Sequence, residues 1–376
     1  MKNTFGSAVG LTIFGESHGA AVGAVLDGLA AGLPVEEAYI AERMDRRRAR
    51  GDGLSTGRTE PDRVEFLSGV LDGHTTGTPL TFVIRNTNTR SGDYARTADL
   101  LRPGHADYTA FAKYEGFQDA RGGGHFSGRI TAAAVAAGAV CERILADRGI
   151  RVYTHIARCA GIDDAPLSSA AGLVCADPEP GHFALLDPSR EAAMQQAIRA
   201  AGAEGDSVGG ILETVITGVP AGVGEPFFDS VESELAHLAF SIPAVKGIEF
   251  GAGFGFADLR GSQANDPFVM RGGDIVTATN RNGGVNGGIA NGMPIVFRTV
   301  VKPTPSIYRE QDTVNFRTRT DTKLQIRGRH DPCIVARAAV VQNTMAAFGI
   351  LDLLTVRYGT LGQKPGRKEP GTCQKG

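Results

Sequence analysis

Four histidines of this chain lie in loops that are rich in glycine and arginine: His18, His105, His125 and His330. Imidazole titrates near neutral pH, so a histidine held beside a ligand can give or take a proton. A single histidine is more often structural than catalytic, but four in the same kind of loop favour a catalytic interpretation. The other four lack such surroundings and are expected to be structural: His74, His155, His182 and His237.

Arginines gather in or beside the same loops. The guanidinium group offers a planar fork of N–H donors that grips a carboxylate or a phosphate at two points. If these arginines converge, they form a site for a small molecule with several negative charges; the alternative is a solvated basic face, above all for 46–48. Backbone N–H groups of Gly122–Gly124 would add an anion-binding nest before a helix that starts near Gly128. The arginines concerned are Arg46, Arg47, Arg48, Arg102, Arg121, Arg129 and Arg329.

Two further polar residues have both a structural and a catalytic interpretation. Asp331 precedes Pro332 at the expected start of a helix, which is a good position for an N-cap. Ser127 is placed in the same way before the helix near Gly128. Either side chain can cap a helix and still face a ligand, so both remain candidates for the site.

Composition and motifs exclude several classes of protein. The net charge of −2 argues against a nucleic-acid binder, whose affinity depends mainly on excess positive charge. The chain has no G-x-x-x-x-G-K-[ST] loop, no G-x-G-x-x-G after a strand and no H-E-x-x-H. Its five cysteines include no C-x-x-C pair, which predicts a reducing compartment and no metal site. No segment resembles a signal peptide or a membrane span, so we expect a cytoplasmic protein without a membrane partner.

The turn 15–19, which carries His18, falls between two predicted strands, 11–14 and 21–26. A helix is predicted to begin at Pro34 and to end at the basic residues 46–48, where positive charge suits a helix C-terminus. Strands are also expected at 64–70 and 80–84. Residues 86–125 look polar and irregular, and a stretch as long as this is usually functional.

Two helices decide the predicted fold class. Residues 131–146 and 334–354 are apolar nearly all round, so they must be buried on most sides. Strands and helices are mixed along the chain rather than strictly alternating. We therefore predict an α+β sandwich with buried helices between sheets, in preference to a doubly wound nucleotide fold.

The remaining elements complete one domain. Strands are expected at 152–158, 211–217 and 295–301, and a helix at 191–201. Asp229 and Glu232 resemble a capping box that opens a helix ending near Phe240. Residues 1–362 are expected to form a single catalytic domain, followed by a disordered tail, 363–376.

Five short motifs resemble those of the chorismate synthase family. They are GESHG at 15–19, RPGHAD at 102–107, RGGG at 121–124, KPT at 302–304 and RHDPC at 329–333. Any one of them is a weak signal, but all five stand in the family's order and at its spacing. The resemblance runs from Phe5 to Leu354, which is nearly the whole chain.

The resemblance implies a β-α-β sandwich subunit, with buried helices between antiparallel sheets, in a homotetramer. It implies a lyase of the shikimate pathway of aromatic amino acid biosynthesis. The reaction is the anti-1,4-elimination of phosphate from 5-enolpyruvylshikimate 3-phosphate, which gives chorismate. Reduced FMN (FMNH2) is required without net redox change, and an electron-rich cofactor suits the removal of a poorly acidic C–H. NADPH enters only indirectly, as the source of reduced flavin, and an external flavin reductase is expected because no dinucleotide fingerprint is present.

The resemblance also implies roles for individual residues. His18 would protonate the departing phosphate, and His105 would act on the reduced flavin. Asp331, with Ser17 nearby, would assist proton removal at flavin N5. Substrate contacts would come from Arg47, Arg48 and Arg129. Contacts to FMN would come from His125, Phe126, Ser127, Ala244, Gly287, Lys302, Pro303, Thr304, Pro305, Ser306 and Arg329.

The chain departs from the common family pattern at a few positions. His125 and Phe126 follow the three glycines where Arg-Ser is usual, so backbone contacts at these positions are better supported than side-chain contacts. Ala49-Arg50 stands in place of a common Pro-Gly, and Pro243 in place of a frequent Asn. We interpret these changes as those of a subfamily variant that keeps the function.

Two other functions remain open at this point. One is a flavin-dependent oxidoreductase on the same scaffold, which would consume an electron donor in proportion to product. The other is a non-catalytic protein that binds a phosphometabolite or RNA, for which residues 46–50 are the best support. The net charge and the scarcity of lysine oppose the second alternative.

Overall fold

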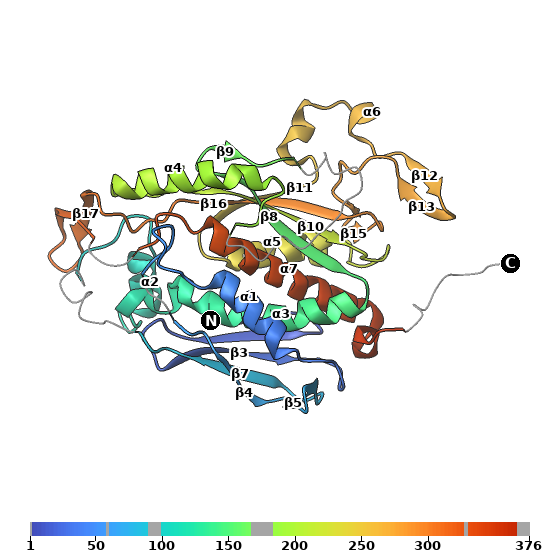
Figure 1. Ribbon diagram of the computed structural model, residues 1–376, viewed down its shortest axis with the longest axis horizontal. Coiled ribbons are helices and arrows are strands. Elements are labelled where there is room, and N and C mark those ends of the chain that lie inside the picture. Colours follow the sequence, from blue (N-terminus) through green and yellow to red (C-terminus); the bar gives the residue numbers. More distant parts are fainter. Residues whose placement is uncertain (1, 58–59, 89–98, 167–182, 327–329, 367–376) are drawn as a thin grey trace.

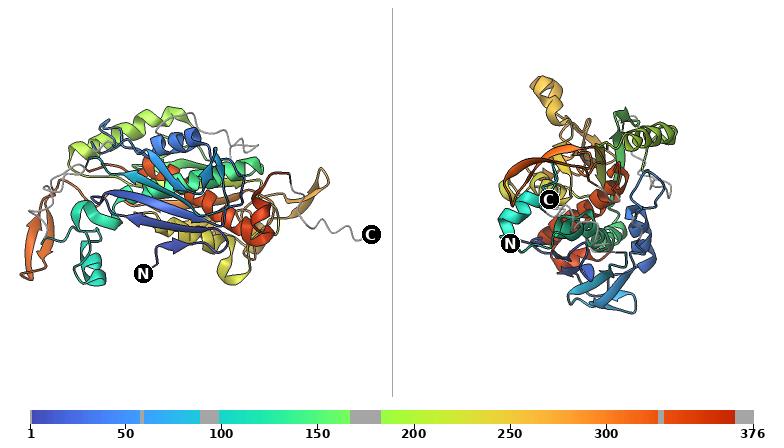
Figure 2. Two further views of the ribbon diagram at one scale, coloured as in Figure 1. Left: turned by 90° about the horizontal axis from the view of Figure 1, so that it is seen from below. Right: turned by 90° about the vertical axis from the view of Figure 1, so that its left-hand side faces the viewer.

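The structure is a computed structural model that describes residues 2–57, 60–88, 99–166, 183–326 and 330–366. Its body consists of a sheet, a layer of helices and a second sheet (Figure 1), and the two further views in Figure 2 show the same layers. The α+β sandwich expected from the sequence is therefore confirmed, with its apolar helices buried between antiparallel sheets.

The first sheet is built from the N-terminal part of the chain. Its inward side chains include Val22, Ala24 and Leu26 of the third strand, which are fully buried beneath the helices. A short separate hairpin, β5 (Val70–Leu71) and β6 (His74–Thr75), interrupts the single strand that was expected at 64–70. The strand order is β1 (Thr4–Phe5), β2 (Gly10–Gly15), β3 (Ala21–Asp27), β7 (Leu80–Arg85) and β4 (Val64–Ser68).

The second sheet comes from the middle of the chain and also pairs its strands in antiparallel fashion. The helix α4 (Glu191–Ala203) covers its outer face (Figure 1). This helix buries Met194 and Ile198 and keeps a polar outer side, as its amphipathic pattern predicted. The strand order is β11 (Val245–Phe250), β16 (Ile295–Val301), β10 (Gly210–Thr217), β8 (Arg151–Cys159) and β9 (Ile162–Asp163).

The layer between the sheets is organised around two helices in close contact. A β-carbon added to Gly138 would lie only 2.3 Å from the carbonyl oxygen of Thr344, so only glycine permits this approach. The flanking alanines of the first helix, at 132–134, 136, 137 and 139, are also small and almost fully buried. The helices of this layer are α1 (Glu37–Arg47), α3 (Thr131–Asp147), α5 (Val231–Ser241) and α7 (Val335–Tyr358).

The last helix, α7, ties the ends of the chain together. Among the described residues it is the one helix long and apolar enough to cross a membrane, but 94% of its apolar window is buried inside the body. It is therefore a core helix. The carboxylate of Asp352 accepts hydrogen bonds from the backbone N–H groups of Ser7, Ala8 and Val9 at 2.7–2.8 Å, which satisfies a buried charge with directed donors.

Several elements were not foreseen. The stretch 86–125 contains a helix, α2 (Asp107–Tyr114), whose polar sequence gives only a weak periodic signal. A 3₁₀ turn at Arg121–Phe126 ends this stretch, and another follows at Gly128–Ile130. A hairpin that follows the short helix α6 (Gly261–Ala264) projects from the body (Figure 1). The hairpins are β12–β13 (Phe268–Arg271, Asp274–Thr277), β14–β15 (Val285–Asn286, Ile289–Ala290) and β17–β18 (Gln311–Asn315, Thr320–Leu324).

Three expected helix starts were wrong by a few residues. The helix α1 begins at Glu37 because Pro34 forms a β-bridge with His74 instead. The N-cap of α5 is Ser230 rather than Asp229, since the Ser230 hydroxyl accepts from the Ser233 backbone N–H at 3.0 Å. The helix α7 begins at Val335, so Asp331 is not its cap.

The end of the described chain is folded as far as Gly366. Gln363, where the disordered tail was expected to start, is buried in the 3₁₀ helix Thr360–Gln363. Its side-chain oxygen accepts from Ala30 N–H at 2.8 Å, and its amide donates to the Gly28 carbonyl at 3.0 Å. The rest of the expected tail, 367–376, lies outside the described residues.

The second sheet contains a buried histidine between two carboxylates. In His155, Nδ1 is 3.0 Å from Asp164 Oδ2 and Nε2 is 3.0 Å from Glu213 Oε2. Burial lowers the pKa of His155, but the hydrogen bonds and charges of the two carboxylates outweigh it, so the pKa is raised. A raised pKa stabilises the fold fully below the unfolded value of about 6.5, and this contribution is lost as pH rises through the folded pKa.

We therefore expect His155→Gln to lower the thermal unfolding midpoint most at about pH 5.5 and progressively less at more alkaline pH. The matched control is His74→Gln, at an exposed histidine of the first half of the chain, which should show no such trend. Unfolding followed by circular dichroism at several pH values measures both. A destabilisation by His155→Gln that stays constant from about pH 5.5 to about pH 9 would contradict the buried imidazolium.

Candidate active site

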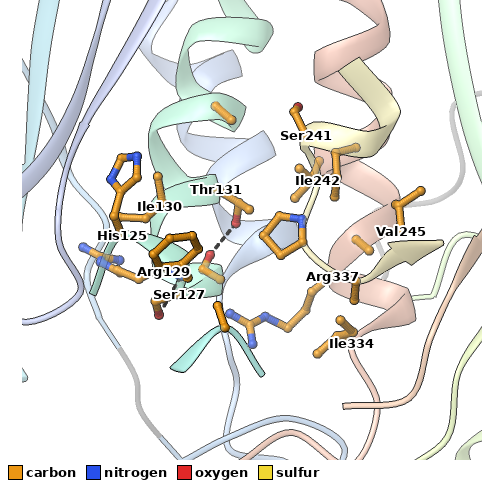
Figure 3. Close-up of a pocket in the computed structure, with 18 of the residues that line it drawn as sticks. His125, Ser127, Arg129, Ile130, Thr131, Ser241, Ile242, Val245, Ile334 and Arg337 are labelled. Atoms are coloured by element: carbon orange, nitrogen blue, oxygen red, sulfur yellow. Dashed lines mark hydrogen bonds between the residues drawn. The ribbon is translucent and has the colours of Figure 1, made fainter. Parts of the chain in front are cut away.

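A cavity of about 940 Å³ opens where α3 and α7 begin. This is near the upper end of the range for small-molecule sites, roughly 300–1,000 Å³. Figure 3 shows two of its sides: residues 125–131 at the start of α3 face Ser241–Val245 and the first turns of α7. One part of the wall is apolar, with Ile242 and Ile334, while the rest carries arginine, lysine and histidine side chains.

Two of the predicted substrate-binding arginines are buried and share one carboxylate. Arg47 Nη2 lies 2.9 Å from Asp62 Oδ2, and Arg129 Nη1 bonds the other oxygen, Asp62 Oδ1. The three side chains are at most 4% exposed. Burial, together with the nearby Arg337 and Arg129, lowers the pKa of Arg47 to about 10 against the opposing effect of Asp62. Two cations and one anion leave a net positive charge in the cavity wall.

Asp331 is held in place by an arginine that the sequence analysis did not single out. Arg337 Nη1 donates to both carboxylate oxygens of Asp331 at 2.9 Å, and Thr56 N–H donates to Asp331 Oδ1 at 2.9 Å. Arg337 also donates through Nε to the carbonyl of Arg47 at 2.8 Å. One feature of the sequence could have revealed Arg337 as part of the site. It is a basic residue in the first turn of a helix, where positive charge opposes the helix dipole and needs a specific partner.

His105 stands in a turn that is pinned to the loop predicted to bind the cofactor. Lys302 Nζ donates to the carbonyl of Gly104 at 2.7 Å, and His105 lines the cavity. On its other side, His105 Nδ1 is 3.0 Å from both Arg102 Nη2 and Asp107 Oδ1. The RPGHAD motif therefore builds a hydrogen-bonded turn that fixes the imidazole at the cavity wall.

His18 and Ser17 do not line the cavity themselves but lie next to Gly122, which does. A β-carbon on Gly122, which lines the cavity, would be 2.6 Å from His18 Nε2 and 3.0 Å from Ser17 Oγ. Gly122 also has φ +62°, in the left-handed region, so glycine is required here for two reasons. Ser17 N–H donates to the Gly124 carbonyl at 3.0 Å. The two motifs GESHG and RGGG thus pack against each other.

The unusual pair His125 and Phe126 has clear positions. His125 Nδ1 is 2.8 Å from the Gly15 carbonyl and donates to it, which ties the glycine-rich segment to the GESHG turn. Phe126 is 37% exposed, lines the cavity and packs edge-to-face on Tyr114 with centroids 6.1 Å apart. Ser127 accepts from Arg129 N–H at 3.3 Å and caps the 3₁₀ turn before α3.

His330, one of the four candidate histidines, also lines the cavity, although the family resemblance implied no particular role for it. Burial lowers its pKa to about 4, helped by the positive charges of Arg102 and His105 and opposed by Asp331. It is therefore neutral at pH 7. Its Nε2 is buried and has no hydrogen-bond partner within the described part of the chain.

The other predicted residues divide into three groups. Arg48, Ala244, Lys302, Thr304, Pro305 and Ser306 line the cavity. Pro303 and Gly287 do not; Gly287 lies in the turn between β14 and β15, and within one chain it does not reach this cavity. Arg329 lies outside the described residues. Two arginines of the predicted cluster also stand apart, because Arg46 pairs with Glu42 and Arg121 with Asp119.

Buried arginines, apolar side chains and histidines at one cavity make it the candidate active site of an enzyme that acts on a small molecule. Comparison with known proteins makes the class specific. The sequence profile described as Chorismate synthase matches residues 9–355, and the chain belongs to this family.

Curated relatives and a solved structure agree with this assignment. The chain is 46% identical over 361 residues to "Chorismate synthase" of Dehalococcoides mccartyi, covering 94% of this chain and 96% of that protein. It is 45% identical over 354 residues to "Chorismate synthase" of Pyrococcus abyssi, covering 94% and 97%. A solved structure, "Crystal Structure of Chorismate Synthase", superposes with a TM-score of 0.71 at 27% identity over 94% of both chains. The expected activity, a lyase of the shikimate pathway, is thereby confirmed.

The shared carboxylate of Asp62 generates a test of the buried cation pair. We expect Asp62→Asn to lower the free energy of unfolding by about 3–5 kcal/mol, because it leaves two buried guanidinium groups without their anion. Denaturant unfolding measures this change. Asp147→Asn is the matched control, since it breaks a partly exposed pair with Arg143 and should cost below about 1 kcal/mol. Equal effects of the two variants would show that Asp62 does not hold the arginines.

Proposed function

We propose that this chain eliminates phosphate from 5-enolpyruvylshikimate 3-phosphate with the help of reduced FMN. The family supplies the reaction. The single observation of the structure that supports it most is the cavity, which is lined by buried arginines, by His105 and by apolar side chains. The cationic side chains suit a substrate with two carboxylates and a phosphate, and the apolar side chains suit a planar aromatic cofactor.

The arginines fit the substrate by charge. Arg47 and Arg129 keep a net positive charge after pairing with Asp62, and Arg48 adds a more exposed cation. In a poorly solvated wall such cations attract anions more strongly than they would in water. We propose that these three arginines bind the substrate, and we add Arg337 as a fourth cation of the wall.

The donor set also fits FMN. Six buried side-chain polar atoms of the described residues lack a hydrogen-bond partner, and three of them belong to residues that line the cavity. These are Arg47 Nε, Thr304 Oγ1 and His330 Nε2. Buried polar atoms without a partner are rare, and a polar ligand would supply one. The loop 302–306, with a lysine and two hydroxyl groups, is proposed to hold the cofactor, together with residues 125–127 and Ala244.

Each residue then has a defined task. Reduced FMN would supply the electron density that a poorly acidic C–H bond requires. As the C–O bond breaks, phosphate leaves with its electron pair, the ring double bond shifts, and the electrons of the broken C–H bond complete a conjugated diene. His18 is proposed to protonate the leaving phosphate, while the arginines stabilise its developing charge. Asp331, oriented by Arg337, is proposed to assist proton removal near the cofactor, with Ser17 close to His18.

We also propose a homotetramer in the cytoplasm. The hairpin β12–β13 exposes Phe268, Met270 and Ile275 by 65–68%, and Phe228 is 90% exposed. Apolar side chains that are this exposed are typical of surfaces that contact another chain. No nucleic acid or membrane is proposed as a partner. An external flavin reductase is proposed to deliver reduced flavin, with NADPH used only by that enzyme.

The activity can be tested directly. With photoreduced FMN under anaerobic conditions, we expect the purified protein to convert 5-enolpyruvylshikimate 3-phosphate to chorismate and phosphate in equal amounts. Chorismate absorbance and a phosphate assay measure this. In air, with only NADPH, FMN and protein, we expect no sustained turnover.

Two outcomes would contradict the proposal. A well-folded sample that forms no chorismate with pre-reduced FMN rules out the proposed reaction. Consumption of an electron donor in proportion to product would instead support a flavin-dependent oxidoreductase.

The division of labour between the two lead histidines has its own test. His18→Ala should lower the single-turnover rate by about 10²–10⁴-fold while substrate and reduced FMN still bind, because it removes one positioned general acid. His105→Ala should in addition change the absorbance of reduced flavin in the ternary complex. His74→Ala, at an exposed histidine, is the control. Near-wild-type turnover in either variant removes that histidine from the mechanism, and identical flavin spectra would refute the division of roles.

A further inference from the structure

Three side chains of the turn 102–107 meet at one nitrogen of His105. Arg102 binds the carboxylate of Asp107 at two points, through Nε to Oδ2 at 2.8 Å and through Nη2 to Oδ1 at 2.5 Å. His105 Nδ1 lies 3.0 Å from that Nη2 and 3.0 Å from that Oδ1. All three side chains are largely buried, at 13–22% exposure.

The two neighbours make opposite demands on Nδ1. A guanidinium nitrogen only donates hydrogen bonds and a carboxylate oxygen only accepts them. If Nδ1 carries a proton, it donates to Asp107; if it does not, it accepts from Arg102. The arrangement therefore decides which of the two neutral tautomers of His105 is populated.

The geometry favours a hydrogen bond from His105 Nδ1–H to the Asp107 carboxylate over one from Arg102 to an unprotonated Nδ1. Arg102 Nη2, Asp107 Oδ1 and His105 Nδ1 form a triangle: Nη2 is 2.5 Å from Oδ1 and 3.0 Å from Nδ1, and Nδ1 is 3.0 Å from Oδ1. The angle at Nη2 between the other two atoms is therefore about 65°. The two N–H bonds of that planar nitrogen diverge by about 120°, so while one points at Oδ1 the other misses Nδ1 by about 55°. Hydrogen bonds weaken steeply when the donor is misaligned, whereas the directions accepted by a carboxylate oxygen are broad. Oδ1 can accept from both donors, but Nη2 cannot serve both acceptors well.

The carboxyl group of Asp107 is ionised at neutral pH. Burial raises the pKa of its carboxyl group, but hydrogen bonds from Arg102 and His105 outweigh that effect and hold the pKa well below its usual range. An ionised carboxylate is thus always present opposite Nδ1 at neutral pH.

The other ring nitrogen is left for a ligand. His105 lines the cavity, and a β-carbon on Gly123 would lie 3.4 Å from its Nε2, so glycine keeps that edge of the ring clear. Nε2 has no hydrogen-bond partner among the residues that the structure describes.

We propose that Asp107 is a positioning residue that fixes neutral His105 as the Nδ1–H tautomer, so that His105 exchanges protons with a bound ligand only through Nε2. The role of Nε2 in turnover rests on the function proposed above, whereas the tautomer itself does not. Neutral His105 then presents a lone pair to the ligand, and only the imidazolium form presents an N–H.

The tautomer can be read without turnover. In protein labelled with ring-¹⁵N histidine, solid-state NMR at a pH where His105 is neutral should show Nδ1 as pyrrole-like and Nε2 as pyridine-like. Comparison with His105→Asn assigns the signals. A pyridine-like Nδ1 in the wild-type protein would overturn the proposal.

Three variants test whether Asp107 is the cause of the tautomer. In Asp107→Asn the two-point grip on Arg102 is lost, so its N–H is free to donate to Nδ1, and the tautomer should change to Nε2–H. Asp107→Glu keeps an anionic acceptor and should retain Nδ1–H. If Asp107→Asn does not fold, Arg102→Met removes the competing donor and should also retain Nδ1–H. An unchanged tautomer in Asp107→Asn, or an Nε2–H tautomer in Arg102→Met, overturns the proposal.

Kinetics separate this inference from the proposed reaction. Asp107→Asn should lower kcat by about 10²–10⁴-fold with little change in KM, because the wrong tautomer misplaces the proton but not the substrate. Asp107→Glu should restore part of kcat, and Asp147→Asn should leave it unchanged. A changed tautomer with unchanged kcat would keep the assignment of the tautomer but overturn the proton transfer through Nε2. Failure of the wild-type protein to form chorismate would refute the proposed function alone.

Discussion

The close approach of α3 and α7 is the constraint on which the rest of the structure depends. Gly138 lets the backbone of α3 touch that of α7 at Thr344, and both sheets pack on the outside of this helix pair. Because the two helices begin at the same cavity, Thr131 and Ile334 at their N-terminal ends both line it. The positive ends of two helix dipoles therefore lie at the site, which favours anions before any side chain is considered.

The arginines of the site are restrained by carboxylates instead of being free. Asp62 holds Arg47 and Arg129, while Asp331 holds Arg337. Each pairing reduces the net charge but fixes the direction of a guanidinium group. A bound anion then meets oriented donors and does not have to immobilise long flexible side chains, which is the advantage of a preorganised site.

Hydropathy predicted the parts of the fold that local sequence determines. The helices at 131–146 and 334–354 and most of the long strands are where their patterns placed them, since a continuous apolar stretch can only be buried. The helix α2 and the hairpins were missed because short polar elements are decided by contacts distant in sequence. The same reason explains why Arg337 and Asp62 were not predicted as residues of the site. Neither stands in a recognisable motif, and each matters only through a partner that the fold brings to it.

The contact between Asp352 and residues 7–9 has a consequence for the order in which the chain folds. The segment at the start of the first sheet finds its anion only after the chain has been synthesised as far as Asp352. Until α7 arrives, the apolar surfaces of α3, β8 and β10 that pack against it lack their cover. Contacts of such long range form slowly, and partly made chains expose apolar surface that can associate wrongly. The most central helix of this protein is thus synthesised after the strands of both sheets, and a chain that stops before α7 lacks the middle of its own core.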